Sequence, residues 1–141
     1  NLLGTKYTGP NMYEFRHVTE ARNGDWSVFS GMDEQCLFAA MFGSCGNIGS
    51  TLNVMPGIYG KIHRHYQSGE LLEARDLQLQ ANRVTATLIE AGFLGAMYAA
   101  LDMLGQSCGQ PRFPEATLSA DAIANLQGDL EAVDFFEIAN M

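Results

Sequence analysis

The 141-residue sequence has few basic residues, no paired cysteine motif and no long apolar run. Eight Lys and Arg against sixteen Asp and Glu give a formal net charge of -8 and a pI near 4.6. The phosphates of nucleic acids and anionic membrane surfaces would repel such a chain. We therefore expect a small molecule or another protein as its partner, and neither nucleic acid nor a membrane.

The cysteines do not have the spacings that bind metals or build disulfide frameworks. Cys36, Cys45 and Cys108 are odd in number and lie among apolar or glycine residues. We interpret them as reduced thiols, which favours a cytoplasmic location. No apolar run reaches the roughly 20 residues that a membrane-spanning helix needs. The first residues also lack the pattern of a signal peptide.

What the chain does contain is a repeated order of short apolar segment, loop and helix. The apolar segments are at 2–8, 26–30 and 46–51, and helical patterns follow at 11–24, 34–42 and 54–66. Asn11 and Asp33 stand where a side chain caps the first and second helix. Because hydrophobic residues make up 47% of the chain, a buried core is expected. The repeated βα order predicts parallel strands in an α/β fold.

The pattern changes after residue 67, where no further strand is predicted. Helical spacing of apolar residues indicates helices at about 70–91, 93–104 and 119–130. We therefore divide one domain into βα units at 1–67 and a helical extension at 68–141. A complete (β/α)8 barrel needs about 250 residues. Either the sheet of this chain is small and open, or the chain is part of a barrel.

A barrel also predicts where chemistry takes place, because barrel active sites lie at the carboxyl ends of the strands. In this sequence those ends are Lys6 to Thr8, Ser30 to Glu34 and Gly49 to Thr51. They bring together an amine, two carboxylates and several hydroxyls. By itself, a lysine at a strand end is commonly only solvated.

The motifs at these three ends resemble one known family. They are Gly4-Thr5-Lys6-Tyr7-Thr8, Gly31-Met32-Asp33-Glu34 and Gly49-Ser50-Thr51-Leu52-Asn53. Together they resemble the carboxyl-terminal half of the Schiff-base aldolase family of dihydrodipicolinate synthase and N-acetylneuraminate lyase. The resemblance implies strands 6 to 8 of a TIM (β/α)8 barrel, followed by a three-helix carboxyl-terminal extension.

The resemblance implies that Lys6 is the catalytic residue. Free lysine is almost wholly protonated at neutral pH and cannot attack a ketone, so apolar walls at the barrel mouth are expected to favour the neutral amine. Lys6 would then form a Schiff base with the keto group of N-acetylneuraminate, which is cleaved to pyruvate and N-acetylmannosamine. Neither a metal nor another cofactor is expected, and the helical His63 and His65 are not expected to bind one.

The resemblance also implies a set of substrate-binding residues. They are Thr8, Gly31, Asp33, Glu34, Gly49 and Ser50. Asp33, Glu34 and Ser50 favour the sialic-acid branch, because they stand where those lyases contact the polyhydroxyl tail of the sugar. Structural roles remain open for them. Asp33 can cap a helix, Glu34 favours its positive end, and the others suit turns.

Other parts of the family's machinery have no counterpart in this chain. The loop that binds the pyruvate carboxylate and the tyrosine that relays the proton belong to the first half of the barrel. We therefore expect this chain to be inactive alone, to need an amino-terminal half and to form a homotetramer once complete. The alternatives are another 2-keto acid as substrate, or a non-catalytic half-barrel that serves as an assembly module.

Overall fold

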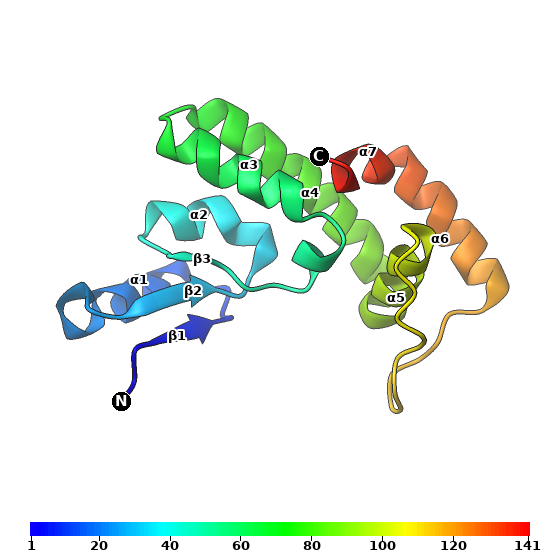
Figure 1. The fold of residues 1–141 in the computed structure, drawn as a ribbon, viewed down its shortest axis with the longest axis horizontal. Coiled ribbons are helices and arrows are strands. Elements are labelled where there is room, and N and C mark those ends of the chain that lie inside the picture. The colour runs from blue at the N-terminus through cyan, green and yellow to red at the C-terminus, as the bar shows by residue number, and fades with distance from the viewer.

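The computed structural model describes residues 1–141 apart from the side chains at positions 22 and 24. Its sheet has three parallel strands in the order β1-β2-β3. They are β1 (Gly4–Tyr7), β2 (Ser27–Ser30) and β3 (Gly46–Asn47). Figure 1 shows the helices that follow each strand and the bundle of helices that ends the chain. The predicted parallel α/β arrangement is confirmed.

The helices among the strands begin and end close to the predicted positions. They are α1 (Met12–Glu20), α2 (Cys36–Met41) and α3 (Pro56–Gln67), with short 3-10 turns η1 (Ala21–Gly24), η2 (Asp33–Gln35) and η3 (Thr51–Asn53). The Asn11 side chain accepts a hydrogen bond from the Tyr13 backbone N–H at 3.0 Å, so the predicted cap of α1 is confirmed.

The predicted cap of the second helix is wrong. The residue preceding η2 is Met32, and no side chain caps the start of η2 or of α2 locally. The Asp33 carboxylate instead binds Thr51, 18 positions away in the sequence. A tertiary partner has therefore replaced the local one, and the helix opens with a 3-10 turn.

Four helices follow α3, one more than predicted for the extension. They are α4 (Leu71–Glu90), α5 (Phe93–Met103), α6 (Ala120–Ala132) and α7 (Phe135–Ala139). Ser119 caps α6 through a 3.2 Å hydrogen bond from the Ala122 N–H. At five residues, α7 is too short to show helical periodicity. It is held by tertiary packing, because Phe135 and Ile138 are buried.

The main hydrophobic core lies between the helices, and a smaller one lies under the sheet. The main core includes Ile58, Ile62, Val84 and Leu88, which are all fully buried. The smaller core consists of Phe15, Val28 and Ala39 on α1, β2 and α2. Because α4 packs against both α3 and η2, the helical bundle is joined directly to the loop that follows β2.

Two strand predictions need correction. Leu2 and Leu3 were expected in a buried strand, but they precede β1 and are 63% and 82% exposed. Among the described residues β1 pairs only with β2, so nothing covers its other edge. β3 ends at Asn47 rather than at position 51, and the 3-10 turn η3 begins at Thr51, whose backbone N–H binds Asp33.

In the part of the chain that is described, no single helix is long and apolar enough to cross a membrane. Only α4 and α5 taken together reach that length and composition, and a bend of 115° separates them.

Candidate active site at the strand ends

The three strands end at the same level, which brings the loops that follow them to one edge of the sheet. Tyr7 pairs with Ser30, and Ser30 pairs with Asn47. Backbone hydrogen bonds of 2.8 Å continue this register beyond the strands, from Gly31 N to Tyr7 O and from Ile48 N to Ser30 O. The predicted substrate-binding residues follow these pairs and therefore lie near one another, and Lys6 lies one pair earlier, opposite Phe29.

A pocket of about 200 Å³ opens at this edge. It is lined by Thr8, Gly31, Met32, Asp33, Glu34, Ser50, Thr51, Thr85 and Phe93. Most of the predicted substrate-binding residues are in this list. Met32, Thr51, Thr85 and Phe93 were not predicted. Thr51 belongs to the motif that carried the resemblance and could have been found from it, whereas Thr85 and Phe93 come from the helical bundle and have no local signal.

Gly31 lies directly against the lysine. A Cβ atom at this position would overlap both Thr8 Oγ1 and Lys6 Cε, so any larger residue would displace these two side chains. Lys6 itself is exposed. The expectation that apolar walls surround it is not met within the described residues, because Lys6 stands on the edge strand β1, whose open side has no neighbour.

The carboxylate of Asp33 is a buried charged group at this edge, with 5% of the residue exposed. Its Oδ2 atom accepts hydrogen bonds from Thr51 N at 2.9 Å and from Thr51 Oγ1 at 2.6 Å. Thr51 Oγ1 also lies 2.7 Å from the Tyr59 hydroxyl on α3. Burial raises the pKa of Tyr59 well above its ordinary value, so this hydroxyl stays protonated and neutral.

The other carboxylate oxygen of Asp33 has a different environment. Oδ1 is buried and has no hydrogen-bond partner among the described residues. It packs against Gly49, where a Cβ atom would overlap the carboxylate. Glycine at position 49 is therefore required for this carboxylate to lie where it does. Asp33 therefore keeps one buried acceptor without a partner among the described residues.

Next to Asp33, a cysteine and a histidine meet behind the pocket. Cys36 Sγ lies 3.5 Å from His63 Nε2, which is 3.3 Å from Asn47 Oδ1. Burial, with a smaller contribution from the Asp33 charge, raises the pKa of the Cys36 thiol to about 12. Burial lowers the pKa of His63. A protonated thiol and a neutral imidazole make this pair a packed core contact rather than a nucleophile and its base.

Neither histidine of α3 belongs to a metal site that the structure describes. His65 Nδ1 lies 2.6 Å from Glu70 Oε2. Because residues two positions apart on a helix do not face the same way, His65 points away from the contact between His63 and Cys36. Across the described residues, no group of three or more His, Cys, Asp or Glu side chains is arranged to hold a metal ion.

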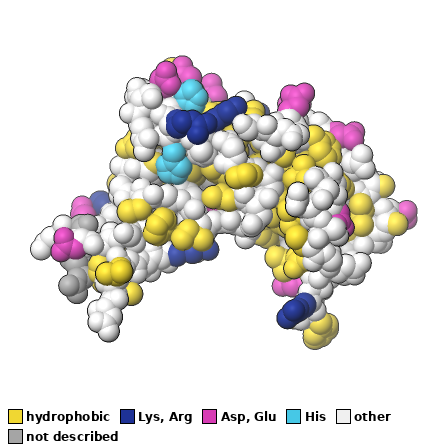
Figure 2. Space-filling view, viewed as in Figure 1, with side chains coloured by type: hydrophobic (Ala, Val, Ile, Leu, Met, Phe, Trp, Pro, Cys, Tyr) yellow, Lys and Arg dark blue, Asp and Glu magenta, His cyan; other side chains and the backbone are white. Residues whose placement is uncertain are grey.

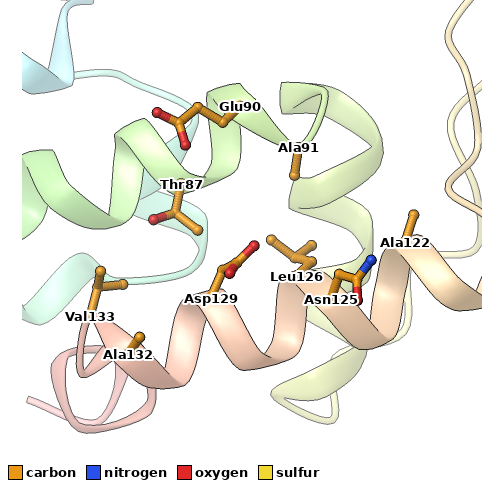
Figure 3. Close-up of a pocket in the computed structure, with 9 residues that line it drawn as sticks. All are labelled: Thr87, Glu90, Ala91, Ala122, Asn125, Leu126, Asp129, Ala132 and Val133. Atoms are coloured by element: carbon orange, nitrogen blue, oxygen red, sulfur yellow. The ribbon is translucent and has the colours of Figure 1, made fainter.

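A larger cavity of about 480 Å³ lies away from the strand ends, between α4 and α6. Figure 3 shows its lining, which includes Thr87 and Glu90 of α4 and Asn125 and Asp129 of α6. None of the predicted site residues lines this cavity. We therefore place the candidate site at the smaller pocket, which is lined by the two carboxylates and by Gly31. Lys6 does not line this pocket but lies against Gly31.

A parallel βα sheet with a lysine and an acidic turn at its carboxyl edge fits part of an α/β barrel, whose active sites lie at this edge. Comparison with protein families agrees with this class. The model of the dihydrodipicolinate synthetase family matches residues 1–133. The chain belongs to this family.

The similar proteins include several N-acetylneuraminate lyases. The lyase of Rhizobium meliloti (strain 1021) is 34% identical over 125 residues, which are 85% of this chain and 42% of that protein. The structure of the Proteus mirabilis lyase has a TM-score of 0.88 and 27% identity, and the match covers 96% of this chain and 46% of that one. For the Aliivibrio salmonicida lyase the TM-score is 0.89, at 25% identity, over 96% of this chain and 45% of that one.

The chain thus spans less than half the length of these relatives. The fold of this chain matches about 45% of the length of TIM-barrel aldolases, which is consistent with a partial barrel. The expected resemblance to this family is confirmed.

Replacing Thr51 with valine tests the hydrogen bonds at Asp33. Thr51→Val keeps the shape of the side chain but removes the hydroxyl between Asp33 Oδ2 and Tyr59. We expect the free energy of unfolding to fall by about 1–3 kcal/mol, because buried polar groups lose a partner. Urea denaturation measures this change. Thr87→Val is the matched control, because the Thr87 hydroxyl bonds the Arg83 carbonyl of its own helix at the surface. An equal effect of both substitutions would contradict the assigned role of Thr51.

Proposed function

We propose that this chain supplies strands 6 to 8 of a (β/α)8 barrel and the lysine of a class I aldolase that cleaves N-acetylneuraminate. The observation that carries the proposal is the position of Lys6 against Gly31, beside a pocket with two carboxylates, in a chain similar to N-acetylneuraminate lyases. The products are pyruvate and N-acetylmannosamine. The chain therefore acts as a carbon–carbon lyase within a complete barrel.

The proposed chemistry begins when the neutral amine of Lys6 adds to the C2 ketone of the open-chain sugar acid. Water leaves with the ketone oxygen, and a protonated imine remains on the lysine. A base takes the proton of the C4 hydroxyl, the C3–C4 bond breaks, and its electron pair forms an enamine. The aldehyde of N-acetylmannosamine departs. Protonation at C3 and hydrolysis release pyruvate and restore Lys6.

The pocket next to Lys6 suits the polyhydroxyl part of the substrate. The carboxylates of Glu34 and Asp33 are hydrogen-bond acceptors, and the hydroxyls of Thr8 and Ser50 both donate and accept hydrogen bonds. Gly31 and Gly49 leave room for the substrate and for the Asp33 carboxylate. We propose no metal or other cofactor for this reaction.

We further propose that the chain needs an amino-terminal half to be active. Its similarity covers 42% of the Rhizobium meliloti lyase, and Lys6 lies exposed on an edge strand. Neighbouring strands would enclose Lys6 and supply the carboxylate-binding loop and the base. The free state of all three cysteines agrees with the cytoplasmic location that we propose.

Two alternatives are distinguished by simple measurements. An aldolase of the same family that acts on a shorter 2-keto acid would turn over that acid faster than N-acetylneuraminate. A non-catalytic assembly module would bind no pyruvate even when combined with a matching first half. Its sheet edges would then serve only for association.

Covalent trapping tests the role of Lys6. The chain has only two lysines, Lys6 and Lys61, so a label within it is easily assigned. In a barrel completed with a matching amino-terminal half, we expect pyruvate and borohydride to modify Lys6, as read by peptide mass. Lys6→Arg should abolish both the label and pyruvate release, whereas Lys61→Arg should retain both. A label on Lys61 in the wild-type chain would overturn the Schiff-base assignment.

We also propose that copies of this chain associate through the outer face of α2, as part of a homotetramer of complete barrels. Phe38 and Met41 are each 54% exposed there, and Phe42 is 41% exposed. Because α2 already packs against α1 and α3 on its two sides, further strands and helices of a barrel would not cover this face.

The partner that this face fits best is a second copy. Residues 35–60 contain no Asp, Glu, Lys or Arg, whereas the chain as a whole carries a formal charge of -8. Figure 2 shows charged side chains mostly towards the periphery of the face in view, with an uncharged middle. Two identical acidic chains repel each other least where charges are absent, so α2 can meet its own copy across a twofold axis.

Placing a charge on α2 tests this association. Phe38→Glu should shift the sedimentation of the chain towards a smaller species, since burying an unpaired carboxylate is unfavourable. The control is Leu72→Glu on α4, where the leucine is 63% exposed and where no contact between copies is expected. Unchanged association of Phe38→Glu, or an equal loss in both variants, would contradict the proposed interface.

A further inference from the structure

Two amide side chains of α4 hold the backbone of the turn that carries both carboxylates of the pocket. Gln78 Nε2 donates to the Asp33 carbonyl at 3.1 Å, and Asn82 Nδ2 donates to the Glu34 carbonyl at 3.1 Å. The two amides also bond each other, from Gln78 Nε2 to Asn82 Oδ1 at 2.8 Å. Gln78 and Asn82 are four positions apart on α4, so their side chains lie on the same face of the helix and both reach the Asp33–Glu34 turn.

Gln78 also replaces the missing cap of α2. Its Oε1 atom accepts the backbone N–H of Leu37 at 2.9 Å, one of the N–H groups at a helix start that lack a partner within the helix. No local side chain caps this start. With one acceptor and two donors engaged, Gln78 has a fixed amide orientation, and only 4% of the residue is exposed.

These contacts fix where the two carboxylates point. Thr51 holds one oxygen of the Asp33 side chain, and Gln78 holds the carbonyl of the same residue. Asn82 holds the carbonyl of Glu34, whose side chain lines the pocket. Neither Gln78 nor Asn82 lines the pocket, and neither bonds any part of β1, where Lys6 lies.

We propose that Gln78 and Asn82 are positioning residues for the polyhydroxyl part of the substrate, acting through the Asp33–Glu34 turn. The inference rests on the proposed aldolase function and extends it. Because the only part of the pocket that their hydrogen bonds reach is the Asp33–Glu34 turn, their loss weakens sugar binding and leaves the reaction of Lys6 with pyruvate intact. A purely structural role would weaken both sides together.

The test separates the two sides of the site in a barrel completed with a matching amino-terminal half. Gln78→Leu removes the buried amide. Asn82→Ala removes the second amide, which is less buried, so this substitution is expected to disturb folding less. Gln80→Leu, two positions along α4 and without a described bond to the turn, is the matched control. The KM for N-acetylneuraminate is compared with the rate at which pyruvate and borohydride modify Lys6.

We expect KM for the sugar acid to rise about 5- to 30-fold in Gln78→Leu and Asn82→Ala, with the rate of Lys6 modification unchanged. Amide exchange at Leu37 should quicken in Gln78→Leu, and Gln80→Leu should match the wild type. An unchanged KM would overturn the inference, as would a parallel loss of Lys6 modification. A wild-type barrel that modifies Lys6 but does not cleave N-acetylneuraminate would instead overturn the proposed substrate.

Discussion

The hydrogen bonds between Thr51 and the Asp33 carboxylate are the constraint on which the candidate site depends. They join the loop after β2 to the loop after β3 in a buried environment, where the loss of either partner would be costly. With Asp33 in this position, residue 49 must be glycine, and the Asp33 side chain does not cap its own helix. The charge that these hydrogen bonds hold in place also helps to keep Cys36 a protonated thiol.

The site that results has two unequal sides. The acidic side is complete, because α3 and α4 support it through Tyr59 and Gln78. The lysine side is open, because Lys6 stands on an edge strand. A Schiff-base mechanism needs a neutral amine, and enclosure by neighbouring strands is what would favour that form. The physical role that we propose for an amino-terminal half is therefore to enclose the amine and to provide the proton-transfer group.

Local patterns in the sequence were enough to predict the parallel strands, the cap at Asn11 and the edge where the site residues gather. They failed where a distant partner decides the outcome. The Asp33 carboxylate accepts a hydrogen bond from Thr51 instead of capping its own helix. At the start of α2, the Leu37 N–H donates to Gln78, which lies 41 positions away in the sequence. Thr85 and Phe93 line the pocket from α4 and α5, and local patterns could not predict this because it depends on how the distant helices pack. Leu2 and Leu3 were mispredicted as buried, because apolar character does not tell whether a neighbouring strand is present.

The central claim is that Asp33 and Glu34 hold the sugar tail beside Lys6. The most direct test is the value of kcat/KM of Glu34→Gln, in a completed barrel, for N-acetylneuraminate and for a shorter 2-keto-3-deoxy sugar acid that lacks the glycerol tail. The account predicts a loss of about 10- to 100-fold for N-acetylneuraminate, because a charged hydrogen-bond acceptor is removed, and little change for the shorter acid. An equal loss for both substrates would contradict it.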